Sequence, residues 1–184
     1  MARQAQTATA VLGVLSIEPA TGYEIRQAVT SVLGHFWHES FGQIYPCLTQ
    51  LEVDGLIRAA PGERANSRRY EITPAGRARL KQLLAEPPTP QPARNGTLLR
   101  VFFGRAQSPS DLTALLDTSE AHARERLATF AGIRAELASE AAYAEHVPYW
   151  SATIRAGELA AEAQLTWVAE TRAALVPPAT LPTS

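Results

Sequence analysis

The segment FGQIYPCLTQLEVDGLI, residues 41–57, has the pattern of an α-helix but carries a proline, Pro46, in its interior. Its apolar residues recur at helical spacing and define one face: Ile44, Leu48 and Leu51. Polar residues occupy the opposite side, and Gly55 is a stop signal after the last apolar position. The spacing therefore predicts a helix whose apolar face is buried and whose polar face is free.

The start of this helix is suggested by Ser40 and Gln43, which have the spacing of a capping box. In that arrangement each side chain satisfies the backbone amide of the other residue. We therefore expect the helix to begin near Phe41, ahead of the proline.

A β-hairpin is predicted downstream of this helix. Residues 56–60, LIRAA, suit a short strand, residues 61–67 supply turn residues, and residues 68–73, RRYEIT, alternate like a returning strand. Thr73 then caps another helix with Pro74 at its first position, where a missing amide costs nothing.

Two further helices are predicted upstream. The apolar segment 8–17 has helical spacing and ends at Pro19, and Thr21 is an N-cap before the apolar-faced stretch 22–36. The resulting order of helix, helix, helix, hairpin and helix is that of a winged helix-turn-helix. In that fold the third helix enters the DNA major groove and the hairpin reaches the flanking backbone.

The charge of the chain is concentrated in one segment. The 184 residues carry a formal net charge of -1, whereas residues 58–81 hold seven basic and two acidic side chains, a local balance of +5. This basic segment coincides with the predicted wing, and arginine can hold phosphate oxygens with two hydrogen bonds. The alternative is that the charges form a solvated surface without a ligand.

Three segments of the chain resemble the PadR family of bacterial transcription regulators. They are LGVLSIEPATGYEIRQAV, FWHESFGQIYPCLTQLEVDGLI and RRYEITPAGRARL, which fall within residues 10–84. The resemblance implies a mainly α (α+β) fold with an N-terminal winged helix-turn-helix and a C-terminal domain of long antiparallel helices that dimerises. It also implies that residues 40–54 form the DNA recognition helix.

On this resemblance, polar residues of the helix and of the wing are the candidate DNA contacts: Ser40, Gly42, Gln43, Tyr45, Thr49, Gln50, Asn66, Ser67, Arg68 and Arg69. Gln43 is the candidate for base reading, since its amide can pair with adenine N6 and N7, although its capping role uses the same group. Tyr45 is a candidate for a phosphate contact. We further hypothesise that Gly42 relieves the ring of Pro46, so that the start of the helix bends toward DNA.

The second half of the chain is predicted to be a helical dimerisation domain. Proline-rich residues 85–96 form a connector, and the family comparison suggests a buried helix over residues 97–104. A long helix capped by Ser108 runs to about residue 142, and a second spans residues 149–175, both with continuous apolar stripes.

Two such helices cannot bury their apolar faces alone, so we expect a homodimer joined by the C-terminal helices. The expected divisions follow from these elements: winged helix 1–86, linker 87–96, helical domain 97–176 and disordered tail 177–184.

Several other classes of protein are not favoured. No apolar run reaches the roughly 20 residues of a membrane span, and the N-terminus does not suggest a signal peptide, so we expect a cytoplasmic protein without membrane contact. His35 and His38 lack further ligands nearby for zinc, and the single cysteine, Cys47, suits a buried position. Without a P-loop or a G-x-S-x-G motif, we expect neither a cofactor nor an enzyme.

The function expected from the sequence is that of a sequence-specific, double-stranded-DNA-binding regulator, a homodimeric repressor released by a small aromatic effector. Aromatic side chains are candidates for the effector pocket, although core packing explains them as well: Trp37, Phe102, Phe103, Tyr149, Trp150 and Trp167. The alternative function is a winged-helix module that binds another protein and no DNA.

Overall fold

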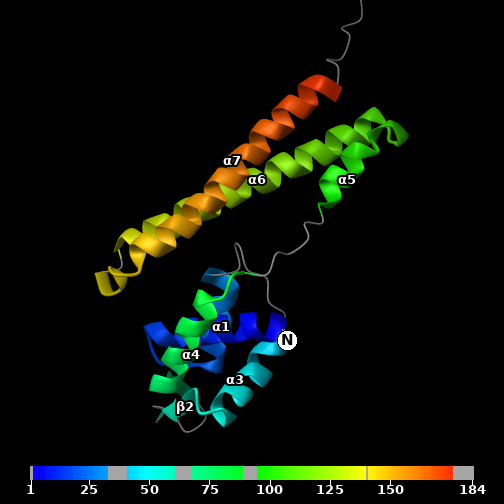
Figure 1. Cartoon of the computed structure of the whole chain (residues 1–184). Helices are drawn as coiled ribbons and strands as arrows, with labels where there is room; N and C mark the ends of the chain where they lie inside the picture. The colour runs from blue at the N-terminus through cyan, green and yellow to red at the C-terminus, as the bar shows by residue number, and fades with distance from the viewer. Residues whose placement is uncertain (1, 33–40, 61–67, 89–94, 140, 176–184) are drawn as a thin grey trace, which may run out of the picture. The chain divides into compact units, whose positions relative to one another are not determined.

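The computed structural model describes residues 2–32, 41–60, 68–88, 95–139 and 141–175. The chain forms two compact units, residues 1–91 and 92–184 (Figure 1). None of the helices in the described ranges combines the length and apolarity that a membrane crossing requires.

The first unit is a set of helices packed beside a small antiparallel sheet. Its elements, in chain order, are α1 (Ala2–Ile17), β1 (Ala20–Thr21), α2 (Gly22–Gln27), a π-helical turn (Ala28–Val32), a 3₁₀ turn (Phe41–Gln43), α3 (Ile44–Val53), β2 (Ile57–Ala60), β3 (Arg69–Ile72) and α4 (Pro74–Ala85). This order confirms the predicted winged helix-turn-helix.

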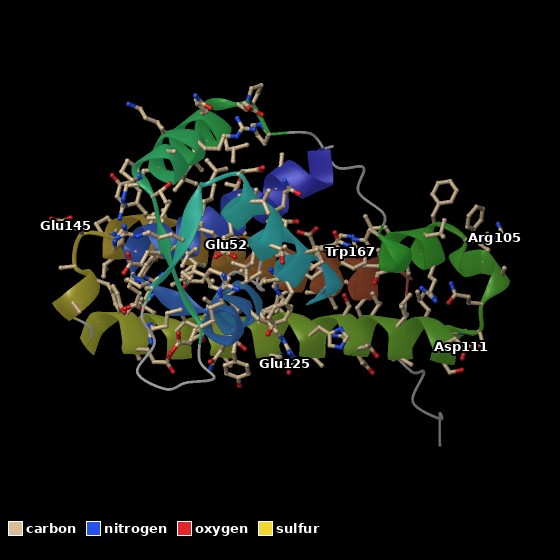
Figure 2. All side chains as sticks on the ribbon, turned by 90° about the horizontal axis from the view of Figure 1, so that it is seen from below. Glu52, Arg105, Asp111, Glu125, Glu145 and Trp167 are labelled. Atoms are coloured by element: carbon tan, nitrogen blue, oxygen red, sulfur yellow. The ribbon has the colours of Figure 1, made fainter. Side chains whose placement is uncertain are left out.

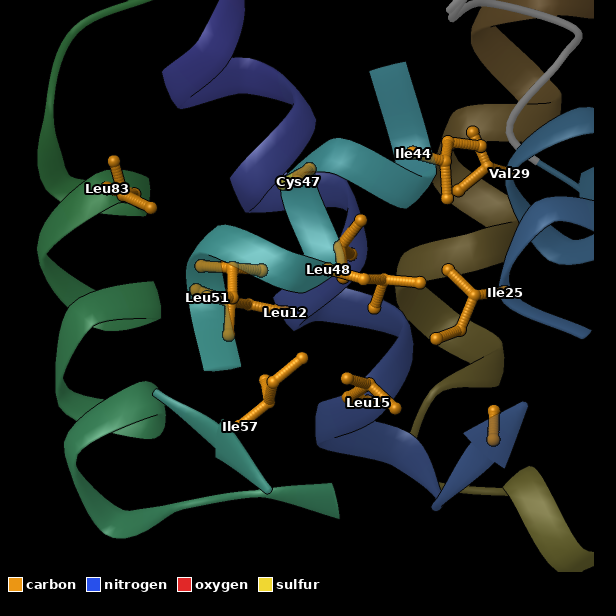
Figure 3. Packing of buried hydrophobic residues seen from close by; sticks show 12 residues of the cluster. Leu12, Leu15, Ile25, Val29, Ile44, Cys47, Leu48, Leu51, Ile57 and Leu83 are labelled. Carbon is orange, nitrogen blue, oxygen red and sulfur yellow. The ribbon is translucent and has the colours of Figure 1, made fainter. Parts of the chain in front are cut away.

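The core of the first unit is built from one apolar face of each element (Figure 3). Its largest fully buried side chains come from α1, α2, α3 and β2: Val11, Leu12, Leu15, Ile25, Ile44, Leu48 and Ile57. Full burial of one such side chain stabilises the fold by about 1.5–3 kcal/mol. The predicted burial of the apolar face of residues 41–57 is therefore confirmed, and Cys47 lies in the same cluster.

Helix α1 is longer than the sequence pattern predicted, since it begins at Ala2 rather than at residue 8. Thr7 is buried, and Ala5 and Ala8 pack against the core. Small residues of this kind carry little hydrophobic periodicity, which explains why the first turns were missed.

The start of the third helix also differs from the prediction. Residues Phe41–Gln43 form a 3₁₀ turn, and the α-helix begins at Ile44 rather than near Phe41. Gln43 is the N-cap residue of α3, and its side chain makes no cap hydrogen bond. Ser40, the other half of the predicted capping box, lies outside the described residues. Pro46 consequently stands in the first turn of α3, where a backbone N–H has no helical partner to lose.

The predicted hairpin is present and is extended by a strand that the sequence did not reveal. Strands β2 and β3 pair antiparallel, with Ile57 opposite Ile72 and Ala60 opposite Arg69. The two-residue strand β1 pairs with the other edge of β3, which gives the sheet order β1-β3-β2. A two-residue strand is too short for an alternating pattern, so only the N-cap function of Thr21 was predictable.

The second unit is a long helical hairpin preceded by a short helix. Its elements are α5 (Gly96–Phe102), a 3₁₀ turn (Gly104–Ala106), α6 (Pro109–Ser139), a 3₁₀ turn (Ala141–Tyr143) and α7 (Val147–Leu175). Salt bridges join α6 to α7. Asp117, early in α6, pairs with Arg172 near the end of α7, and Arg134, late in α6, pairs with Glu158 nearer the start of α7. The two helices are therefore antiparallel.

The predicted apolar stripes of α6 and α7 face each other within one chain, so the premise that the two helices cannot bury these faces alone is wrong. Their buried members are Leu112, Leu116, Ala123, Phe130, Ile154, Ala161 and Val168. The boundaries are shifted: α6 ends at Ser139 rather than at about residue 142, and α7 begins at Val147 rather than at Tyr149. Pro148 thus lies in the first turn of α7, where proline is tolerated.

The expectation that residues 97–104 form a buried helix is wrong for the single chain. Helix α5 has no buried residue, and Phe102 is 82% exposed. Its apolar side chains face solvent because α5 packs on α6 only through a few residues, Val101 among them.

Candidate nucleic-acid interface

Helix α3 presents an exposed polar face on the side opposite its buried residues. Its exposed residues are Tyr45, Pro46, Thr49, Gln50 and Val53, and the 3₁₀ turn ahead of it adds Gly42 and Gln43. The Thr49 hydroxyl donates to the Tyr45 carbonyl at 3.2 Å, and the Gln50 amide donates to the Asp54 carboxylate at 2.8 Å. The exposed residues within α3 itself are uncharged, and the Asp54 carboxylate lies at the C-terminal end of this face, so the amide and hydroxyl groups nearer the start of α3 can approach base edges without repelling phosphates.

Helix α2 packs closely against the first turn of α3. A Cβ on Gly22 would lie 2.9 Å from Tyr45 Cε1 and 3.4 Å from Leu48 Cδ1, so only glycine allows this approach. The contact fixes one side of the Tyr45 ring, while the residue stays 51% exposed. Tyr23, the neighbour of Gly22, is also exposed at 65% and was not among the residues predicted from the sequence.

The start of α2 is held by a complete capping box. The Thr21 N–H donates to Glu24 Oε2 at 2.7 Å, and the Glu24 N–H donates to Thr21 Oγ1 at 3.2 Å. The hydrogen bond from the Thr21 backbone is the main reason why the pKa of Glu24 lies below its usual value, and the nearby Arg69 guanidinium lowers it further.

The end of α3 is tied to the wing by backbone and side-chain hydrogen bonds. The Leu56 N–H donates to the Leu51 carbonyl and the Gly55 N–H donates to the Glu52 carbonyl, with Gly55 at φ +69°. The Thr73 hydroxyl donates to the Gly55 carbonyl at 2.8 Å. These bonds fix the direction in which the hairpin leaves the helix.

The start of α4 reinforces the same junction. The Gly76 N–H donates to the hydroxyl of Thr73 at 3.0 Å, so the predicted cap is confirmed. A Cβ on Gly76 would lie 2.0 Å from the Leu56 carbonyl oxygen, so α4 begins in direct backbone contact with the residue that immediately precedes β2.

The two wing arginines, Arg68 and Arg69, point to different parts of the unit. Side chains alternate across a strand, so Arg68 and Tyr70 lie on the same side. The guanidinium carbon of Arg68 lies over the Tyr70 ring, 5.5 Å from its centroid. Arg68 Nη2 donates to Glu52 Oε1 on α3. The base of the wing and the helix therefore adjoin.

Arg69 occupies the opposite side of β3. Its Nη2 donates to the Pro19 carbonyl at 2.6 Å, and its Nη1 lies 3.6 Å from Glu24 Oε1. These contacts tie the wing to the start of α2, so its guanidinium is engaged within the fold. Asn66 and Ser67 lie outside the described residues.

The basic character of the wing is reduced by carboxylates that are distant in the sequence. Glu52 and Glu24 pair with Arg68 and Arg69, and Arg58 pairs with Glu71 across the hairpin at 2.7 Å. The balance of +5 was counted over residues 58–81, which include Glu71 but neither Glu24 nor Glu52. The interface is consequently less positive than the sequence segment alone indicates.

The aromatic residues predicted to line an effector pocket do not form one cluster in the second unit. Phe102 and Phe103 make an edge-to-face pair at 5.0 Å, and Trp167 packs near the start of α6. Trp150 stacks on His146 at 5.3 Å at the opposite end of the hairpin. Trp150 and Trp167 are 17 positions apart on α7, which corresponds to about 25 Å along the helix.

Figure 2 shows Trp167 toward the end of the second unit that carries Arg105 and Asp111, with Glu145 at the other end. Trp37 lies outside the described residues, as do His35 and His38. Within the described ranges, no three His, Cys, Asp or Glu side chains are grouped as metal ligands.

A helical unit with a β-hairpin wing, a polar third helix and a following helical hairpin defines the class of winged-helix transcriptional regulators. The family model "Transcriptional regulator PadR-like family" matches residues 11–82, and the model "Virulence activator alpha C-term" matches residues 93–176. The chain belongs to the PadR-like family of transcriptional regulators, whose members are regulators and not enzymes.

Individual relatives agree with this membership. The negative transcriptional regulator PadR of Bacillus subtilis is 30% identical over 98 residues, which cover 51% of this chain and 54% of that protein. The chain thus aligns with about half the length of this curated relative. A probable transcriptional regulator of Mycobacterium tuberculosis is 29% identical over 181 residues, or 90% of this chain and 95% of that protein.

A solved structure also matches the whole architecture. The crystal structure of Bacillus subtilis PadR in complex with operator DNA has a TM-score of 0.77 and 22% identity, and the match covers 91% of this chain and 97% of that chain. At this identity the likeness shows the fold.

Proposed function

We propose that this chain is a repressor that binds double-stranded operator DNA through α3 and the wing. The observation that carries the proposal is the uncharged polar face of α3, flanked by the Arg68 guanidinium at the base of the wing. Gln43, Thr49 and Gln50 would read base edges, and Tyr45 and Arg68 would hold the backbone. The solved Bacillus subtilis relative is a complex with operator DNA, which supports DNA as the partner.

The proposal includes a homodimer joined by the helices of residues 97–176, with residues 87–96 as the linker. The second unit exposes large apolar side chains that a lone chain leaves in water: Leu98, Leu99, Phe102, Phe103, Tyr149 and Leu159. Exposed apolar side chains in this number are typical of an interaction surface. A two-fold dimer would place two copies of α3 about one DNA turn apart, which suits an inverted-repeat operator.

The proposal also includes release by a small aromatic effector. Bacillus subtilis PadR has been solved with p-coumaric acid, which makes a phenolic acid the first ligand to test. Because one chain keeps Trp150 and Trp167 far apart, we place the effector beside one aromatic group rather than among all six predicted residues. Thermal-shift and DNA-release titrations with p-coumaric acid would test this part.

The decisive experiment for DNA binding is a mobility-shift titration against the intergenic DNA upstream of the protein's own gene at two salt concentrations. A repressor binds this DNA with an affinity that falls steeply as salt rises. A winged-helix module for protein partners would ignore it, and that result would refute the proposal. Light scattering on the same sample would report whether the binding species is a dimer.

A further inference from the structure

Glu52 is a carboxylate on the last turn of the helix that faces DNA in the proposed function. Its side chain is 29% exposed, and Figure 2 shows it on α3. A carboxylate beside a DNA-binding face repels phosphates, so Glu52 lowers the affinity of this helix for DNA. Its partner in the structure is Arg68, the wing arginine on the same side as α3.

We infer that Glu52 is an affinity-limiting residue that competes with the DNA backbone for the guanidinium of Arg68. Arg68 is held at two points, by the Glu52 carboxylate and by the face of the Tyr70 ring, while its side chain stays 59% exposed. A phosphate that approaches this exposed guanidinium meets the attraction of Arg68 and the repulsion of Glu52 together. The inference rests on the proposed function, because it assigns the way in which that same interface limits its affinity.

The geometry distinguishes this pair from the other two on the wing. Arg69 bonds to the Pro19 carbonyl and pairs with Glu24 on the face of the hairpin opposite to Tyr70. The pair of Arg58 and Glu71 lies on the same face as Arg69. The Glu52–Arg68 pair alone among these three connects the wing to α3. Removing the Glu52 charge therefore frees an arginine at the interface.

The test is the Glu52→Gln variant of the full chain, titrated against the upstream intergenic duplex and against a scrambled duplex of equal length and composition. Glutamine keeps the size of the side chain and removes its charge. We expect affinity for both duplexes to rise about three- to fivefold. The attraction between two opposite unit charges a few ångströms apart in water changes an equilibrium constant by about that factor. The salt dependence should become steeper by about one phosphate contact.

Two controls isolate the cause. Glu71→Gln removes the same charge from the pair on the other side of the hairpin and should change affinity by less than about twofold, because more distant charges are screened. In an Arg68→Gln background, Glu52→Gln should lose most of its gain, since the two residues act as a coupled pair. Matching thermal unfolding curves would show that each variant keeps the fold.

The outcomes separate the inference from the function on which it rests. If wild-type protein binds with a steep salt dependence but Glu52→Gln binds equally or more weakly, the inference is overturned and the proposed function stands. An equal gain with and without Arg68 would also overturn it, because Glu52 would then act by itself. If wild-type protein binds neither duplex, both fall.

Discussion

The Phe130 ring of α6 lies against the backbone of Gly157 on α7, so closely that a Cβ on Gly157 would be 2.2 Å from Phe130 Cζ. Phe130 is only 2% exposed, which leaves its rigid ring little freedom to move aside. The contact sets how closely the two long helices approach, because any larger residue at this position would force them apart.

Gly157→Ala should therefore destabilise the helical hairpin despite the better helix propensity of alanine. We expect a net loss of about 1–2 kcal/mol, as overpacking costs about 1–3 kcal/mol and the propensity gain returns up to about 1 kcal/mol. The matched control is Gly132→Ala on α6, where a Cβ meets no atom within 4 Å and where stability should rise. Chemical denaturation would measure both, and a stabilised Gly157→Ala would contradict the packing argument.

Substitution of the two adjacent wing arginines should affect different properties, DNA binding for Arg68 and stability for Arg69. Arg68→Gln should lower the slope of DNA affinity against salt by about 1, since one phosphate contact is lost. Arg69→Gln should instead lower the free energy of unfolding, by about 0.5–1.5 kcal/mol, because its hydrogen bond to the Pro19 carbonyl disappears. Mobility shifts at several salt concentrations and thermal unfolding measure the two quantities, and a larger salt effect for Arg69→Gln would reverse the assignment.

This pair also shows where sequence reasoning ends. The helix periodicity predicted which face of α3 is buried, whereas the sequence named Arg68 and Arg69 alike as candidate DNA contacts and did not separate them. The partners Glu52 and Pro19 are 16 and 50 residues away in the chain, so only the folded structure identifies them.

The same limit explains the other differences. Strand β1 exists because β3 offers a free edge beside Ala20–Thr21, and no local pattern encodes that pairing. Helix α1 begins ahead of residue 8, and the small side chains of Ala5 and Thr7 are packed in or against the core, a tertiary contact that hydrophobic periodicity does not record.

The helical hairpin should be acid-sensitive through Glu158. The pKa of Glu158 lies below its usual value, chiefly because the Arg134 guanidinium on α6 donates hydrogen bonds to it, and Arg155 adds to the effect while burial opposes it. A group whose pKa is lower in the folded state stabilises the fold above its unfolded pKa, near 4.5, and this contribution is lost as the pH falls through the folded pKa.

The free energy of unfolding of Glu158→Gln should therefore lie below that of wild type at neutral pH. The difference should shrink as the pH falls below about 4.5. Glu125→Gln is the matched control, because the Glu125 side chain is exposed and forms no ion pair within the described part of α6 and α7. A difference that stays constant from pH 7 to pH 3, roughly the range over which carboxylates titrate, would exclude the ion pair as its cause.

Pro46 should determine how the start of α3 meets DNA. The chain changes from a 3₁₀ turn, which contains Gly42, to an α-helix two residues before this proline. Pro46→Ala supplies an N–H that can bond to the Gly42 carbonyl, so the α-helix should extend backward through residues 41–43 and turn Gln43 away from its present direction. Stability should change little, since the proline lies in the first turn.

Operator affinity of Pro46→Ala should fall by about 1–3 kcal/mol, the usual value of one well-placed amide–base contact. Affinity for scrambled DNA should stay constant, because Gln43 contributes no charge to the phosphate interaction. Gln43→Ala gives the matched comparison: it should produce a similar loss, and the double variant should lose no more than either single one. Unchanged operator affinity and specificity in Pro46→Ala would refute the hypothesis that Gly42 and Pro46 act together to orient the helix.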